Sequence, residues 1–180
     1  MVVKGWRRSG DRLVGTLQHN EAVLLRGLVT QIREILAARL AESPVDELSA
    51  ITGIRPGPST PPRDRVLARL LPDFNQDDPE LAGVLRSLHE PELIEAKDGV
   101  AAVVLRTCPP EGGKIRLTMA ESEAWLSALN DIRLALGTVL EVTEDMPDRL
   151  PESDPRAPHL DVYQWLTFVQ DSLVHAVSAQ

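Results

Sequence analysis

The stretch WLSALNDIRLALGTVLEV, residues 125–142, decides the fold because it is apolar on almost every side. On a helical wheel of ~100° per residue, its main apolar stripe lies within about 60° of Trp125. The stripe consists of Leu129, Ile132, Leu136, Val139 and Leu140. Leu126 and Leu134 lie far outside it. A helix that is apolar nearly all round is covered on several sides, so the sequence predicts a central helix in a helical domain.

Polar and small residues interrupt this central helix on one boundary face. Asn130, Arg133 and Gly137 share that face at spacings of three and four residues. A half-buried Arg133 needs a carboxylate or carbonyl partner from another element, because an unpaired buried charge is strongly destabilising. Gly137 typically marks a close approach of backbone or ligand. We interpret the three residues as a structural clasp between helices, with a small-ligand pocket or a partner site as the alternative.

Further helices are indicated on both sides of the central one. Amphipathic spacing predicts helices over residues 21–40 and 160–177. Asp78 followed by Pro79 is typical of a helix start. Pro91 predicts a break or a kink, because proline lacks a backbone donor and clashes with the preceding turn, and we expect two helices, over 79–89 and 91–107. Shorter helices are expected near 45–51 and 63–71.

A small sheet is predicted at one end of these helices. Thr118 and Glu121 have the spacing of a capping box, and a short strand near 114–117 precedes them. An N-terminal hairpin is expected, with Trp6–Arg8 turning back through SGD into a strand near 13–16. The sequence therefore predicts a mainly α fold, a single-domain helical bundle over 1–180 with this small antiparallel sheet. Pro-rich loops are expected at 53–62 and 144–158 within that domain.

Charge and hydropathy restrict the class of protein. A net charge of −8 argues against a stand-alone nucleic-acid binder. The charge is uneven: residues 1–40 hold seven basic and three acidic residues, whereas residues 141–180 hold two and eight. No stretch is apolar for the ~20 residues that a membrane span needs, and the start lacks the apolar core of a signal peptide. We expect a cytoplasmic protein without membrane contact.

Few residues are candidates for chemistry. Cys108 is the one cysteine, so the chain can form no internal disulfide. With Arg106 and Lys114 nearby, Cys108 is a candidate redox residue, and an inert thiol is the alternative. The four histidines form no pair with metal-ligand spacing on one helical face, and no catalytic motif is present. We therefore expect a non-enzymatic protein with no catalytic residue, metal or cofactor.

Three stretches carry a resemblance to a known family. They are VLARLLPDF…DDPEL (66–81), WLSALNDIRLALGTVLEVTED (125–145) and VYQWLTFVQDSLVHA (162–176). They resemble the actinobacterial family named after the oxidative-stress regulator AosR. The resemblance extends over nearly the whole chain and implies an all-helical or nearly all-helical fold. It also implies transcriptional control in response to oxidants, through association with an alternative sigma factor.

The resemblance further implies a protein partner, a sigma factor or RNA polymerase. The basic first forty residues leave room for DNA contact only within such a complex. A homodimer is also considered. Redox sensing in the family's regulator uses a pair of cysteines, whereas this chain has only Cys108. Family genes tend to lie beside that of a Clp protease adaptor, which implies an adaptor role as one alternative. The other alternative is a small-ligand-binding domain with a pocket near Arg133.

Overall fold

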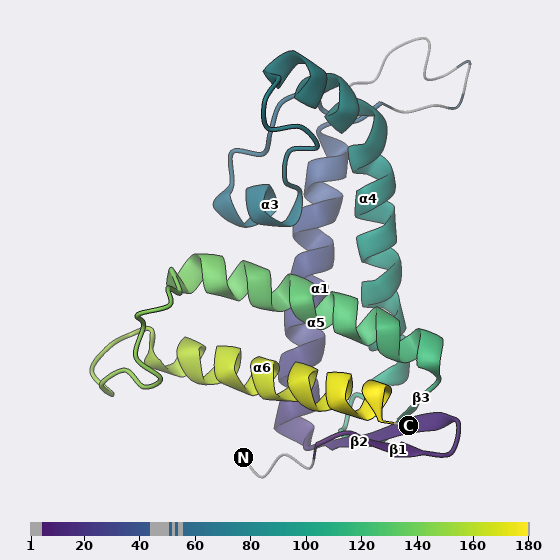
Figure 1. Ribbon diagram of the computed structural model, residues 1–180, viewed down its shortest axis with the longest axis vertical. Helices are drawn as coiled ribbons and strands as arrows, with labels where there is room; N and C mark the ends of the chain where they lie inside the picture. The colour runs from purple at the N-terminus through teal and green to yellow at the C-terminus, as the bar shows by residue number, and fades with distance from the viewer. Residues whose placement is uncertain (1–4, 44–50, 52, 54–55, 180) are drawn as a thin grey trace.

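Two antiparallel helix pairs cross each other to form the body of the molecule (Figure 1). The computed structural model describes residues 5–43, 51, 53 and 56–179. The helices of this part are α1 (His19–Ala41), α3 (Arg65–Leu70), α4 (Pro79–Thr107), α5 (Met119–Leu140) and α6 (Ala157–Ser178). α1 pairs with α4, and α5 pairs with α6 across them. None of the described helices is long and apolar enough to cross a membrane.

A three-stranded antiparallel sheet lies at one end of the α1/α4 pair. Its strands are β1 (Arg7–Ser9), β2 (Arg12–Leu17) and β3 (Gly113–Leu117), in the order β1-β2-β3. Gly10 makes the tight hairpin turn with φ 64°. Leu13 pairs with Leu117 across β2 and β3. The mainly α fold with this small sheet confirms the prediction from the sequence.

Two strands lead directly into helices through caps. The Glu121 carboxylate accepts from the Thr118 N–H at 2.8 Å, and the Thr118 hydroxyl accepts from the Glu121 N–H at 3.1 Å. Glu21 likewise accepts from the Gln18 N–H at 2.7 Å. These bonds satisfy amides that the first turn leaves free. The caps fix α5 and α1 at the edge of the sheet.

The predicted break at Pro91 is wrong: α4 is one helix from Pro79 to Thr107 with Pro91 inside it. Proline removes the donor that would bond the Ser87 carbonyl. The Gly57 N–H takes that place and donates to the Ser87 oxygen at 2.7 Å. A Cβ on Gly57 would lie 2.9 Å from the Pro91 ring, so only glycine fits. The helix therefore bends without ending, as its upper part in Figure 1 shows.

The other predicted helices compare as follows. The helices expected over 21–40, 63–71 and 160–177 are confirmed as α1, α3 and α6. The helix expected near 45–51 lies essentially outside the described residues. The N-terminal and C-terminal elements lie together, because the Trp6 N–H donates to Ser172 Oγ at 3.4 Å and Arg8 Nη1 donates to the Ala179 oxygen at 2.7 Å.

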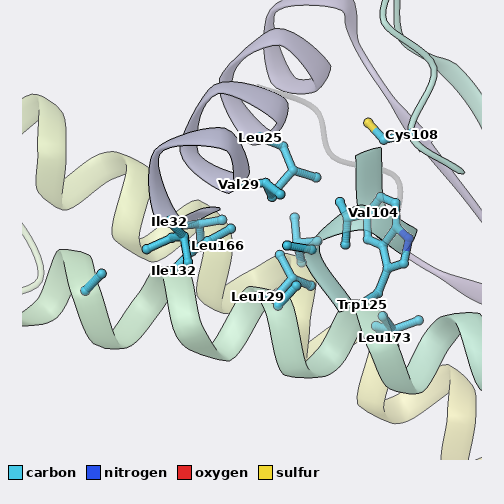
Figure 2. Close-up of a cluster of buried hydrophobic side chains, with 14 of the residues drawn as sticks. Leu25, Val29, Ile32, Val104, Cys108, Trp125, Leu129, Ile132, Leu166 and Leu173 are labelled. Atoms are coloured by element: carbon cyan, nitrogen blue, oxygen red, sulfur yellow. The ribbon is translucent and has the colours of Figure 1, made fainter. Parts of the chain in front are cut away.

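The core lies where the two helix pairs cross (Figure 2). α1 supplies Leu25, Val29 and Ile32, while the other helices supply Val104, Trp125, Leu129, Ile132, Leu166 and Leu173. Trp125 is fully buried, and its indole N–H donates to Thr107 Oγ1 at 2.7 Å. The Trp6 ring meets it edge to face at 5.2 Å between centroids. The sheet and the helical body therefore share one core.

Candidate functional site

A group of fully buried charges joins α1 to the N-terminal half of α4. Arg39, Arg86 and Glu90 are each at most 3% exposed. Arg39 Nε donates to Glu90 Oε1 at 2.6 Å, and Arg86 Nη1 donates to Glu90 Oε2. We call these three residues the buried triad. One carboxylate is thus held between two guanidinium groups in the interior.

Arg39 and Arg86 also donate hydrogen bonds to groups other than Glu90. Arg39 donates to Glu42 Oε2 at 2.6 Å and to the Thr60 carbonyl at 2.5 Å. Arg86 donates to Asp73 Oδ1 at 2.5 Å and to the Leu71 carbonyl at 3.2 Å. Buried charges that are this fully paired hold a structure together and leave little for a ligand. We assign the buried triad a structural role.

The buried triad does not follow from the local sequence pattern. Arg39 and Glu90 are 51 residues apart, so nothing local links them. The available signal was the pair Arg86 and Glu90, which lie four residues apart on one helix and therefore face each other.

A second ion pair joins α4 to α5. Lys97 Nζ lies 2.6 Å from Asp131 Oδ1, and Asp131 is 5% exposed. Burial raises the pKa of the Asp131 carboxyl, while the hydrogen bond and charge of Lys97 oppose the rise. Asn130 is exposed and lines a shallow depression of about 280 Å³ beside this pair.

Arg133 and Gly137 lie together against α6. Arg133 Nη1 donates to Gln170 Oε1 at 2.5 Å, and its guanidinium lies 5.5 Å from the centroid of the Tyr163 ring. Gly137 faces the same ring, where an added Cβ would be 3.3 Å from Tyr163 Cε2. The partner of Arg133 is a carbonyl from another element, as its sequence position required. The structure therefore places two of the three expected clasp residues together, and Asn130 beside α4.

A cleft of about 640 Å³ opens next to Arg133. It lies between the α5 and α6 side chains and the connection that follows α5. Its lining includes Arg133, Thr143, Glu144, Met146, Asp148, Arg149, Tyr163 and Gln164. Arg133 Nε is buried and has no hydrogen-bond partner among the described residues. Among the described residues, its guanidinium donates only to the neutral amide of Gln170 and has no direct carboxylate contact.

A third hollow, of about 370 Å³, lies between α1, α3 and α5. It is lined by Leu28, Ile32 and Ile35 of α1, Val66 and Leu67 of α3, and Ile132, Ala135, Leu136 and Val139 of α5, together with Gln31, Glu34 and Asp64. We call this the α1/α3/α5 groove. Its wall is mainly aliphatic, and its charged lining residues are both acidic.

Cys108 is buried at the end of α4, with 1% of its surface exposed. Burial raises the pKa of the thiol, while the nearby Arg26 opposes the rise. Arg26 donates to the carbonyls of Leu105 and Cys108 at 2.6 and 2.7 Å and so completes the helix end. A buried, protonated thiol is a poor nucleophile. Among the described residues, no three His, Cys, Asp or Glu side chains gather where a metal ion would bind.

Known proteins match the chain over almost its full length. A family described as a domain of unknown function (DUF2017) matches residues 3–177. The chain belongs to the DUF2017 family. The putative oxidative stress regulator AosR of Mycobacterium leprae is 42% identical over 194 aligned residues, which cover 98% of this chain and 89% of that protein.

Two further relatives have a similar identity. The oxidative stress regulators AosR of Mycobacterium bovis and of Mycobacterium tuberculosis H37Rv are each 43% identical, over 96% of this chain and 87% of the relative. No solved structure gives a significant match. The resemblance predicted from the sequence is confirmed. This DUF2017 chain is therefore related to proteins named as regulators.

Proposed function

We propose that this chain is an oxidative-stress regulator that acts in the cytoplasm by binding a sigma factor or RNA polymerase, without catalysis of its own. The observation that carries the proposal is the similarity of 42–43% identity, over nearly the whole chain, to relatives named oxidative stress regulators. The net charge of −8 favours a protein partner over stand-alone binding to DNA.

Purification from actinobacterial cells tests this proposal. The tagged chain is recovered with and without peroxide treatment, and the proteins that accompany it are identified by mass spectrometry, with the tag alone as control. We expect enrichment of a sigma factor or a polymerase subunit. Recovery of Clp protease subunits in their place contradicts the proposal and favours the adaptor alternative. Recovery of the chain alone, as monomer or homodimer, contradicts both.

A second candidate function is binding of a small anion beside Arg133. Arg133, which donates to a neutral amide, favours it together with Arg149, because cations at a hollow attract carboxylates and phosphates. Glu144 and Asp148 also line the cleft, so the anion must contact the two arginines directly. We expect small carboxylates or phosphates to raise the melting temperature of the chain. Arg133→Gln abolishes that rise, whereas the control Arg65→Gln, which removes an exposed cation outside the cleft, keeps it. A rise that survives Arg133→Gln contradicts this candidate.

A further inference from the structure

We infer that the α1/α3/α5 groove is the docking surface for a basic amphipathic helix of a partner protein. The inference rests on the proposed function, because it supplies the surface that a regulator acting through a protein partner needs. It names the chemistry of the partner segment: leucine-like side chains along one face, with lysine or arginine beside them.

The walls of the groove are the first argument. α1 contributes Leu28, Ile32 and Ile35, which follow one another at helical spacing. α5 contributes Leu136 and Val139 from the opposite side. Val139 is 64% exposed although it is aliphatic. Large apolar side chains from separate helices thus converge on a concave surface, which is the pattern of a helix-in-groove site.

The length of α3 is the second argument. α1 has 23 residues and α5 has 22, whereas α3, which packs against α5, has six. At 1.5 Å per residue, a helix of six residues covers only a small part of the surface that the two long helices offer. The groove lies beside α3, because residues of α1, α3 and α5 line it together. A further helical segment would extend the same packing.

The charge of the rim is the third argument, and it selects the partner. Glu34 and Asp64 are the charged residues among those lining the groove, and both are exposed. In the described part of the chain, neither takes part in an ion pair, and Asp64 also caps α3 by accepting from the Leu67 N–H at 2.9 Å. Two carboxylates at the edge of an aliphatic groove complement lysine or arginine flanking an apolar helix face. An acidic helix would be repelled there.

A labelled peptide provides a direct test. The probe is a designed helix of about 15 residues, roughly four turns, with leucines on one face and lysines on the other. Its binding is measured by fluorescence anisotropy at low and at physiological salt. Two control peptides are used: one with the same composition in scrambled order, and one with glutamate in place of each lysine. We expect only the amphipathic basic peptide to bind well.

Variants of the chain locate the binding. Val139→Ser should weaken binding about tenfold, the effect of a loss of about 1.4 kcal/mol at an apolar contact. The matched control Leu88→Ser removes an equally exposed aliphatic side chain from α4 and should leave binding unchanged. Glu34→Gln should weaken binding about threefold at low salt, whereas Glu92→Gln, which removes an exposed carboxylate from α4, should not.

Several outcomes overturn the inference. If the scrambled peptide binds as well as the amphipathic one, the binding comes from general charge attraction and not from an apolar helix face. Binding that survives Val139→Ser and Glu34→Gln lies elsewhere. A dimer of the wild-type chain that Val139→Ser dissociates would show that a second copy covers the groove. Because the peptide test uses only the purified chain, its failure is distinct from a failure to recover a sigma factor or polymerase from cells.

Discussion

The buried triad and the surroundings of Arg133 both contain guanidinium groups between helices, yet the two sites differ in what surrounds the charge. Arg39 and Arg86 meet carboxylates in the interior. Arg133 meets the amide oxygen of Gln170 and the face of Tyr163, beside an open cleft. The difference shows that an arginine can have its charge matched by carboxylates in one region of a fold and only by an amide and a ring in another.

The largest effect is expected when the buried triad loses its carboxylate. Glu90→Ala leaves two buried guanidinium groups without their shared partner, and breaking such a pair destabilises a protein by about 3–5 kcal/mol. Urea unfolding followed by circular dichroism measures the change. The control Glu92→Ala removes an exposed carboxylate two residues away and should change stability by less than about 0.5 kcal/mol.

A triple variant sharpens this result. Replacing Arg39, Arg86 and Glu90 together by methionine, methionine and leucine removes every buried charge of the triad. We expect it to be more stable than Glu90→Ala, because no buried charge is left unpaired. Equal loss in both variants would contradict the assigned role of charge pairing and would show that shape alone matters at this site.

A smaller effect is expected at the other guanidinium. Arg133→Met keeps the apolar stem of the side chain and removes one hydrogen bond to a neutral amide, so the free energy of unfolding should fall by about 1 kcal/mol. The same urea experiment measures it. A loss as large as that of Glu90→Ala would erase the distinction between the two sites and would make Arg133 a structural residue.

The Lys97–Asp131 ion pair can be tested through the pH dependence of the free energy of unfolding. The pKa of Asp131 is raised in the folded state, so the folded chain takes up this proton at a higher pH than the unfolded chain does. Lowering the pH from 7 towards 4 should therefore stabilise the wild type relative to Asp131→Asn. Urea unfolding of both proteins across this range measures the difference.

Glu121 supplies the control of opposite sign. The backbone N–H of Thr118 lowers the pKa of this carboxyl, so its contribution to stability is present at neutral pH and is lost as the pH falls through its folded pKa. The wild type should therefore lose stability relative to Glu121→Gln on acidification. The same sign for both carboxyls would contradict the environments described for them.

The smallest effect is expected at Cys108. Its thiol is buried and its pKa is raised, so a thiol reagent should modify it only after denaturant unfolds the chain. Absorbance during labelling with and without denaturant measures this. The control is Cys108→Ala, which should not react in either condition. Rapid labelling of the native chain would make Cys108 accessible and restore it as a redox candidate.

The sequence predicted the parts of this fold that depend on local pattern. The stripe around Trp125 placed the central helix, and Thr118 with Glu121 placed its start. Pro91 misled because the donor that compensates for it comes from Gly57, far away in the sequence. The buried triad was missed for the same reason: Arg39 reads as part of a polar helix face until α4 packs against it.

The role of the residues around Arg133 stays a prediction, but part of their arrangement could be expected from the sequence. The sequence indicated that Arg133 needs a carbonyl or carboxylate from another element, and α6 provides the Gln170 oxygen. A helical wheel placed Asn130 on the same face as Arg133. A wheel gives the angle of each side chain around its helix, but it does not show which other helix the side chain meets. α6 covers Arg133 and Gly137, whereas Asn130 lies one turn earlier, next to α4. The groove needs three helices together, so no single stretch of sequence predicts it.

The contact between β1 and the last turn of α6 has a consequence for how the chain is connected. Arg8 bonds the Ala179 carbonyl across 171 residues of sequence, so the backbone follows a nearly closed ring. When two distant segments lie this close, the helices can pack in the same way even if the ends of the polypeptide are placed elsewhere in the ring. A circular permutant that joins these two segments and opens within the exposed connection at 151–153 should reach the same architecture.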